Sequence, residues 1–194
     1  MATCGRWRTT PASPTSAEAP MHIRRLTPAD ASVYQAVRLA ALKELPTAYG
    51  SSYAEEEHAP LAMLEDILAH KPDRGTFGAF RASQLVGLVS VAREAQLNTS
   101  HKGLVWGMYV RPDLRGQGLG RELLLRAIAH ARSMPGLLQV NLAVGATNVP
   151  ALRLYESVGF RVFGVEAGAM LVQGQPVDEI HMQLRLAPLD AARG

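Results

Sequence analysis

The chain of 194 residues lacks the features that define several large protein classes. It has one cysteine, Cys4, so it cannot form an intramolecular disulfide or a multi-cysteine zinc site. No apolar run approaches the roughly 18 residues that a membrane-spanning helix needs. The six histidines show no metal-binding spacing such as HExxH. These absences exclude disulfide-rich and integral membrane proteins, and we expect no metal site and no membrane partner.

Lysine is also scarce. Only Lys43, Lys71 and Lys102 stand beside 17 arginines, in a chain with a net charge of +3 and a pI of 9.3. Such a pI partly reflects the lack of groups that titrate between histidine and arginine. The basic residues are scattered, whereas proteins that bind nucleic acid usually cluster them on one face. We therefore expect no nucleic-acid partner.

What is present is typical of one folded domain. Hydrophobic residues make up 47% of the chain and charged residues 19%. Residues 1–20 differ, because they are rich in Thr, Ser, Ala and Pro and lack the apolar core of a signal peptide. We predict a disordered leader over residues 1–20, with an organelle transit segment as a minor alternative. A domain over residues 21–187, a tail over 188–194 and a cytoplasmic location complete this prediction.

Hydrophobic spacing and turn residues predict the order of helices and strands. Thr27 and Pro28 are typical of a helix start, and Pro46 ends that helix. A second helix begins at Pro60. The remaining elements are a first strand at 21–26, a hairpin of strands 76–82 and 85–93 turning at Ser83-Gln84, a strand at 103–110, a helix at 121–132, a strand at 138–144, a helix at 148–158, and strands at 161–166, 169–173 and 177–186. This order indicates a mixed α+β domain without the regular alternation of a doubly wound fold.

A glycine-rich loop follows the strand at 103–110 and opens the next helix. Its pattern is R-x-x-G-x-G, formed by Arg115, Gly118 and Gly120. Glycines let the backbone approach a ligand, and the first amides of a helix are free donors at the positive end of its dipole. Such a loop suits a pyrophosphate. A nucleotide P-loop is excluded because no Lys-Ser or Lys-Thr pair is present, and a dinucleotide fingerprint fails because Leu123 stands at its third glycine position. A glycine-rich turn without a ligand stays open on this motif alone.

A second motif lies downstream, where Asn148 to Tyr155 reads NVPALRLY and Gly159-Phe160 follow. In this order, the two motifs resemble those of the GNAT superfamily of N-acetyltransferases, and the resemblance covers about Met21 to Leu186. It implies a mixed, mostly antiparallel central sheet flanked by helices and splayed between two strands at the cofactor slot. It also implies acetyl-CoA as co-substrate, and a small-molecule, peptide or protein amine as acceptor. A monomer or a homodimer fits equally well. A non-catalytic module that senses acyl-CoA is the alternative function.

The resemblance assigns roles to individual residues. Tyr155 would be the general acid that protonates the departing sulfur, and Asn148 would touch the pantetheine arm. The two lie two helical turns apart, about 10 Å along one helix face. Tyr155 packing the helix on the sheet is the alternative. The other expected cofactor-binding residues are Met108, Tyr109 and Val110 through their backbone, the loop residues Arg115, Gly116, Gln117, Gly118, Leu119, Gly120 and Arg121, and also Asn141 and Ala151.

The general base is open, because no carboxylate occurs on the strand at 103–110, where many relatives have a glutamate. Glu55 and Glu56 are the first candidates, since they lie between the first two helices, where relatives often shape the acceptor pocket. A solvated acidic run that includes Glu57 is the alternative, as is an amine that needs no dedicated base. Asp178, Glu179 and His101 are weaker candidates. Trp106 is either an ordinary sheet side chain or part of the acceptor slot.

Overall fold

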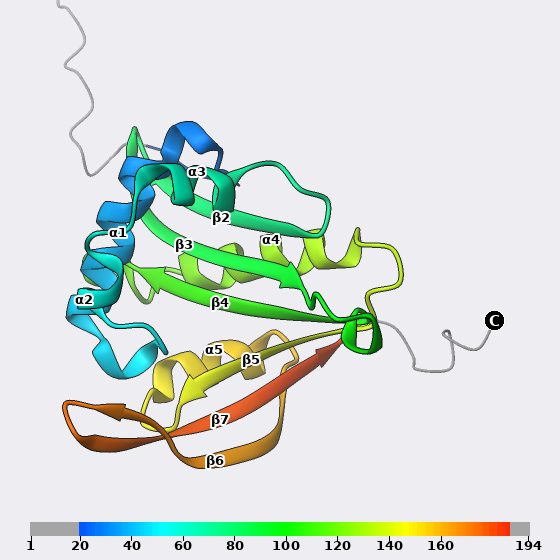
Figure 1. The fold of residues 1–194 in the computed structure, drawn as a ribbon. Coiled ribbons are helices and arrows are strands. Elements are labelled where there is room, and N and C mark those ends of the chain that lie inside the picture. Colours follow the sequence, from blue (N-terminus) through cyan, green and yellow to red (C-terminus); the bar gives the residue numbers. More distant parts are fainter. Residues whose placement is uncertain (1–19, 187–194) are drawn as a thin grey trace, which may run out of the picture.

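The computed structural model describes residues 20–186. The leader expected at residues 1–20 therefore lies, except for Pro20, outside the described residues, as does the expected tail at 188–194. A seven-stranded sheet with the order β1-β2-β3-β4-β5-β7-β6 forms the centre of the fold (Figure 1). Its strands are β1 Met21–Arg25, β2 Arg74–Arg81, β3 Gln84–Arg93, β4 Lys102–Val110, β5 Gln139–Gly145, β6 Arg161–Val172 and β7 Gln175–Arg185. The helices are α1 Ala31–Glu44, α2 Tyr53–Glu56, α3 Leu61–Leu68, α4 Leu119–Arg132 and α5 Val149–Ser157.

The sheet is interrupted in its middle. Every neighbouring pair of strands is antiparallel except β4 and β5, which run parallel. These two strands pair only from Lys102 to Leu104 on β4 and from Gln139 to Asn141 on β5. Beyond these three pairs the strands separate. This confirms the expected fold class, a mixed and mostly antiparallel sheet that is splayed between two strands.

Helices cover both faces of the sheet. One core cluster joins α1 and α3 to the sheet through side chains such as Leu42, Leu88 and Tyr109. The other joins α4 and the end of α5 to the opposite face through Leu123, Leu124 and Phe160. Strand β3 is buried on both faces, which explains its nearly continuous apolar sequence. Val105 and Val110 of β4 belong to the second cluster and Tyr109 to the first, so both faces of β4 are packed beyond the point where it parts from β5.

Among the boundaries that differ from the sequence prediction, two change how neighbouring strands connect. The β2–β3 hairpin turns at Ala82-Ser83 rather than at Ser83-Gln84, because Arg81 pairs with Gln84. Ala82 then adopts a left-handed φ of 51°. The two strands expected at 161–166 and 169–173 form one strand, β6, with a register shift between Glu166 and Met170. The carboxylate of Asp178 accepts the Gly168 amide at 2.8 Å inside this shift, which keeps the strand continuous.

The first helix begins at a charged cluster. Both Asp30 oxygens accept from the Arg24 guanidinium at 2.7 Å, and one of them also accepts from the Thr27 amide at 2.8 Å. These hydrogen bonds, led by the one from Arg24, hold the pKa of Asp30 well below its ordinary value. The Asp30 carboxylate therefore stabilises the fold at any pH above the ordinary aspartate pKa.

Replacing Asp30 by asparagine is expected to lower the free energy of unfolding at pH 7 by about 1–3 kcal/mol. The difference should shrink below about pH 4, because the wild-type carboxylate then begins to lose what its depressed pKa contributes. Urea unfolding at pH 7 and pH 3 measures both values. Asp66→Asn is the control, because Asp66 pairs with Lys71 at an exposed position and should change little. An equal loss for Asp30→Asn at both pH values would contradict the assignment.

No helix within residues 20–186 is long and apolar enough to cross a membrane. The same residues contain no group of three or more His, Cys, Asp or Glu side chains that could hold a metal ion.

Candidate active site

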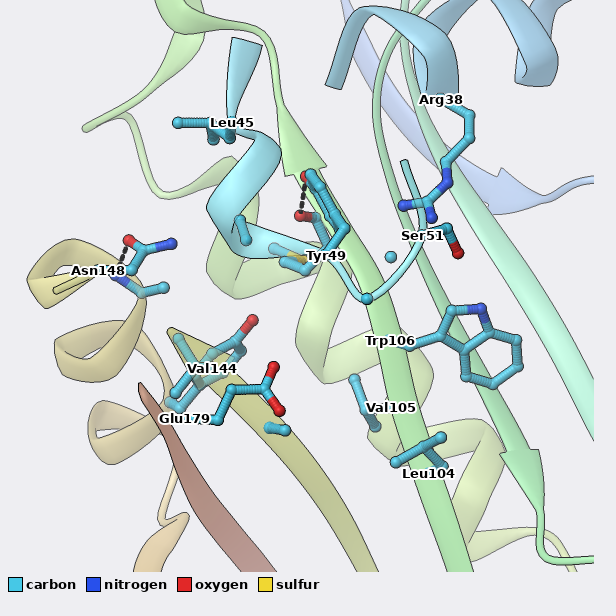
Figure 2. A pocket seen from close by; sticks show the side chains of 17 residues that line it. Arg38, Leu45, Tyr49, Ser51, Leu104, Val105, Trp106, Val144, Asn148 and Glu179 are labelled. Atoms are coloured by element: carbon cyan, nitrogen blue, oxygen red, sulfur yellow. Dashed lines mark hydrogen bonds between the residues drawn. The ribbon is translucent and has the colours of Figure 1, made fainter. Parts of the chain in front are cut away.

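A pocket of about 260 Å³ lies where β4 and β5 separate (Figure 2). Strands β4, β5 and β7, helices α1 and α5 and the segment after α1 all contribute to its walls. The lining residues are Arg38, Leu45, Ala48, Tyr49, Gly50, Ser51, Leu104, Val105, Trp106, Gly107, Met108, Ala143, Val144, Asn148, Ala151, Tyr155 and Glu179. Of the residues expected to bind the cofactor, it thus brings together Met108, Asn148, Ala151 and Tyr155. Asn141 lies at the last β4–β5 pair and does not line the pocket.

A β-bulge in β4 shapes the pocket wall. Leu88 of β3 pairs with Tyr109, but Ser90 pairs with Trp106, so β4 has one residue more than β3 in this interval. Gly107 lies in the bulge with φ of 66°, a conformation that favours glycine. The side chain of Trp106 is 37% exposed and lines the pocket. Trp106 is thus a sheet residue that borders the pocket, and its expected role in an acceptor slot stays a prediction.

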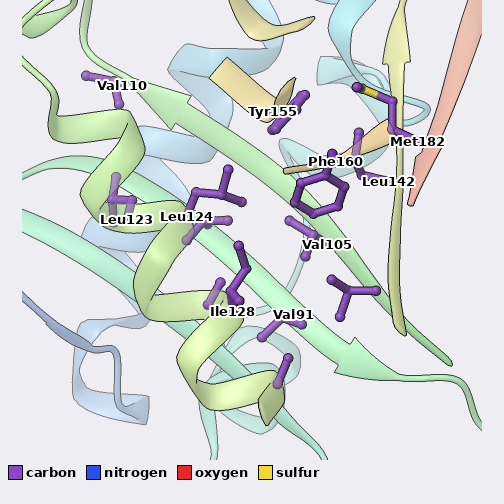
Figure 3. Close-up of a cluster of buried hydrophobic side chains, with 14 of the residues drawn as sticks. Val91, Val105, Val110, Leu123, Leu124, Ile128, Leu142, Tyr155, Phe160 and Met182 are labelled. Carbon is purple, nitrogen blue, oxygen red and sulfur yellow. The ribbon is translucent and has the colours of Figure 1, made fainter. Parts of the chain in front are cut away.

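Tyr155 lies between the pocket and the core. It is only 7% exposed, and its ring meets Phe160 edge to face at a centroid distance of 5.9 Å (Figure 3). Its phenol makes no hydrogen bond to any of residues 20–186. Burial raises the pKa of Tyr155 above its ordinary value of 10. The phenol therefore stays protonated at neutral pH and keeps its donor free for a ligand.

Asn148 begins α5 as its N-cap. Its Oδ1 accepts from the Ala151 amide at 3.3 Å, and its side chain also borders the pocket. Asparagine is among the preferred N-cap residues, and Pro150 supports the first turn. The same side chain thus fixes the start of α5 and faces the pocket.

At the C-terminal end of β4, one edge of the strand has no strand partner. The Arg111 amide donates to Val86 O at 2.9 Å, which makes the preceding pair, Val110 with Gly87, a non-hydrogen-bonded pair. The N–H and C=O of Val110 therefore point away from β3, towards the gap between β4 and β5. An extended ligand in the gap would find an open strand edge there.

Two side chains satisfy carbonyls on this edge. The Tyr49 hydroxyl donates to Met108 O at 3.0 Å, and Arg115 Nε donates to Val110 O at 2.8 Å. Tyr49 is 9% exposed, and burial raises its pKa to about 12. Because these two carbonyls are already paired, the open edge can offer a ligand its N–H donors, such as that of Val110.

The glycine-rich loop presents a row of free amides. The amides of Gly116, Gln117, Gly118, Leu119, Gly120 and Arg121 donate no hydrogen bond within residues 20–186, and the first helical bond of α4 runs from Glu122 N to Gly118 O at 3.1 Å. Gly116 and Gly118 have φ of 75° and 84°. A Cβ on Gly120 would lie 3.2 Å from Met108 Cε, so this glycine lets α4 approach β4 closely. The loop is a concave set of donors at a helix N-terminus, suited to an anion.

Glu44, at the end of α1, ties this loop to the strand. It accepts from Arg115 Nη2 at 2.6 Å and from the Tyr109 hydroxyl at 2.8 Å. Burial, followed by the hydrogen bond to Glu44, raises the pKa of Tyr109 to about 12. Two nitrogens of Arg115 are therefore engaged by protein groups, and the backbone amides are the loop's free donors.

The carboxylates first considered as bases lie away from the pocket lining. Glu55 accepts from the Ser52 amide at 2.6 Å in a capping box, which lowers its pKa. Glu56 forms a two-pronged ion pair with Arg38 at 2.7 and 2.9 Å. Glu57 and Asp178 are not among the lining residues, nor is His101. Glu179 of β7 is the carboxylate that lines the pocket (Figure 2).

The pocket residues that were not identified from the sequence include Arg38, Tyr49 and Gly107. Glycine inside a strand pattern is a known signal of a bulge, so Gly107 was open to prediction. Arg38 and Tyr49 carry no such signal, because their position depends on how α1 and the segment after it fold across β4.

Comparisons with known proteins agree with this geometry. The family model described as the acetyltransferase (GNAT) family matches residues 39–160. A mycothiol acetyltransferase of Thermobispora bispora is 45% identical over 110 residues, which are 53% of this chain and 37% of that protein. One from Thermomonospora curvata is 34% identical over 122 residues, 60% of this chain and 39% of that protein. The chain thus matches less than two-fifths of the length of these relatives.

Solved structures share the fold. An acetyltransferase of the GNAT family from Streptococcus pneumoniae superposes with a TM-score of 0.76 at 24% identity, covering 86% of this chain and 99% of that one. A protein from Salmonella typhimurium, whose structure holds its cofactor acetyl-CoA, gives 0.72 at 23% identity, with coverage of 88% and 96%. Since the family model matches more than half of the residues, the chain belongs to the acetyltransferase (GNAT) family, as its two motifs predicted.

Proposed function

We propose that the chain transfers an acetyl group from acetyl-CoA directly to an amine. One observation carries this proposal. The free phenol of Tyr155 lies on a pocket between separated strands, beside a helix N-terminus with unpaired amides. Acetyl-CoA has to be held at its phosphates, along its pantetheine arm and at its sulfur. The unpaired helix amides, the edge of the separated strand and the Tyr155 phenol supply donors for these three parts.

The chain's residues fit such a co-substrate. The amides of Gly116 to Arg121 suit the pyrophosphate, and the Val110 amide suits the arm. Asn148 and Ala151 border the same path on α5. Arg115 acts as a positioning residue, because its guanidinium joins Glu44 to Val110 O and so holds the loop at the strand end. When bound, acetyl-CoA supplies the activated acetyl group.

Two groups of this chain handle protons in the proposed reaction. The Tyr155 phenol donates to the sulfur, since its raised pKa keeps it protonated. Glu179 accepts the proton of the amine, directly or through water, because its carboxylate borders the pocket and pairs with no cation among residues 20–186. We prefer Glu179 to Glu55 and Glu56, whose oxygens are already engaged.

Glu179→Gln is expected to lower kcat/KM at pH 7 by about 100-fold. The loss should become smaller as the pH rises, since more of the amine is then neutral without help. Release of coenzyme A between pH 6 and pH 10 measures this profile. Glu166→Gln is the matched control, because Glu166 is the cross-strand neighbour of Glu179 but pairs with His181 outside the pocket. Equal profiles for wild type and Glu179→Gln would remove Glu179 from the mechanism.

The proposed function itself is tested by two measurements on the full chain. Calorimetry determines whether acetyl-CoA binds, and a thiol reagent follows coenzyme A release over a panel of small amines, amino-acid amides and peptides. Binding with release supports the transferase. Binding without release from any amine would favour the acyl-CoA sensor instead.

A further inference from the structure

Arg38 has one nitrogen whose N–H groups find no acceptor within residues 20–186. Its Nε and Nη2 atoms bind the two oxygens of Glu56 at 2.9 and 2.7 Å. Its Nη1 atom is buried and has no partner among residues 20–186. Arg38 as a whole is 8% exposed, and it lines the pocket. Buried donors are nearly always paired, so an unpaired one beside a pocket calls for a partner that the described part of the chain does not supply.

The guanidinium is fixed in place by its neighbours. The fork with Glu56 holds two of its nitrogens, and its centre lies 4.7 Å from the centroid of the Tyr49 ring. Burial alone would lower the pKa of Arg38, but the hydrogen-bonded Glu56 carboxylate raises it above its ordinary value, so the group stays charged. Its charge is largely balanced by Glu56. The remaining donor at Nη1 therefore suits an oxygen acceptor, either a carbonyl or a carboxylate, and disfavours an ammonium group.

The pocket wall opposite Arg38 favours the opposite kind of ligand group. Figure 2 shows Arg38 directed into the pocket from α1, with Glu179 on the far wall near Val144. A carboxylate there favours an amine and disfavours a second carboxylate. The two walls thus distinguish the ends of an acceptor that carries both an amine and an oxygen.

We propose that Arg38 is a specificity-determining residue whose Nη1 donates to a carbonyl or carboxylate oxygen of the acceptor, while the acceptor amine lies toward Glu179. The acceptor class is then an amino acid, an amino-acid amide or a peptide, and simple alkyl amines are poor substrates. This inference rests on the proposed function and specifies its acceptor. It requires the pocket wall at Arg38 to open slightly when the acceptor binds, because Nη1 is closed to solvent in the structure.

Matched pairs of amines test the inference. Glycinamide is compared with 2-methylpropylamine, and β-alaninamide with 3-methylbutylamine, because each pair has the same number and connectivity of heavy atoms and differs in having an amide oxygen and nitrogen or two methyl groups. The full chain is assayed for coenzyme A release, and kcat/KM is taken for the neutral form of each amine. We expect a preference of about 10- to 100-fold for the amides. Triglycine as a further probe distinguishes a peptide source of this chemistry from a free amino-acid derivative.

Two variants separate recognition from folding. Arg38→Lys keeps a cation for Glu56 but has no rigid second donor, so kcat/KM for the amides should fall at least tenfold more than kcat/KM for the matched alkyl amines. Glu56→Gln weakens the ion pair but keeps Nη1, so the preference should persist even if the unfolding temperature falls. A similar loss of preference in both variants would indicate a structural effect and overturn the proposal.

The remaining outcomes are also decisive. Coenzyme A release without any amide preference in the wild type overturns the role of Arg38 and leaves the proposed function intact. The same holds if Arg38→Lys retains the full preference. If Arg38→Lys does not fold, the amide preference of the wild type and of Glu56→Gln tests the proposal. No release from any amine would contradict the proposed function, and the inference with it.

Discussion

Replacement of Tyr155 by phenylalanine is expected to lower kcat about 100-fold or more, with little change in the KM for acetyl-CoA. The phenol has no hydrogen-bond partner among residues 20–186, so its removal breaks no internal contact. The ring contact with Phe160 remains possible, and the unfolding temperature should stay close to that of the wild type. The loss would therefore report on proton donation alone. Steady-state release of coenzyme A measures it.

The pH profile gives this prediction a second test. Because burial raises the pKa of Tyr155 above 10, the phenol remains protonated through pH 9. Deprotonation of Tyr155 should thus cause no decline of the wild-type kcat below pH 10. Any decline seen in that range should also occur in Tyr155→Phe. Tyr34→Phe is the control, since Tyr34 is equally buried but does not line the pocket. If Tyr155→Phe left turnover unchanged over the full pH range, the proton would have to come from another group.

Gly118→Asp is expected to weaken acetyl-CoA binding by about 10- to 100-fold. The new carboxylate would stand at the N-cap of α4, among the free amides and next to the place proposed for the phosphates. Gly118 has φ of 84°, and its Cβ direction is open, so Asp and Asn are the side chains that best tolerate the position. An acidic N-cap also stabilises a helix, so affinity should fall without loss of fold.

Gly118→Asn separates charge from backbone strain in this experiment. Both variants share the left-handed conformation and nearly the same shape, and only one adds a negative charge. Calorimetric titration of acetyl-CoA should give a loss of a few-fold for Asn and a much larger one for Asp. Equal affinities for the two variants would place the phosphates elsewhere.

Much of the fold was predictable because its signals are local. Thr27-Pro28, Pro46 and Gly159 mark helix ends, and the apolar stretch of β3 marks a buried strand. The strand at 161–172 was divided in the prediction because Gly168 reads as a break. Its continuity depends on Asp178, a residue on the neighbouring strand that supplies the missing acceptor. Such a tertiary contact has no signature in the sequence around Gly168.

The residues of the candidate site could be predicted only where they belong to a local sequence motif. The glycine loop and the α5 segment are short patterns with their own geometry. The acidic run at Glu55 and Glu56 looked like a source of bases, but one carboxylate caps α2 and the other binds Arg38. Glu179 and Arg38 meet at the pocket from positions 141 residues apart in the chain, and no spacing rule connects them.

The bulge at Gly107 gives β4 two sections that can change independently. Trp106 and Tyr109 are three positions apart, yet both side chains lie on the α1 side of the sheet, because the extra residue resets the alternation. Before the bulge, Leu104 and Trp106 line the pocket proposed for the acceptor. After it, Met108 and Val110 present the backbone edge that the donor would use. Substitutions before Gly107 can therefore change the side chains that line the pocket without altering the main-chain edge after the bulge.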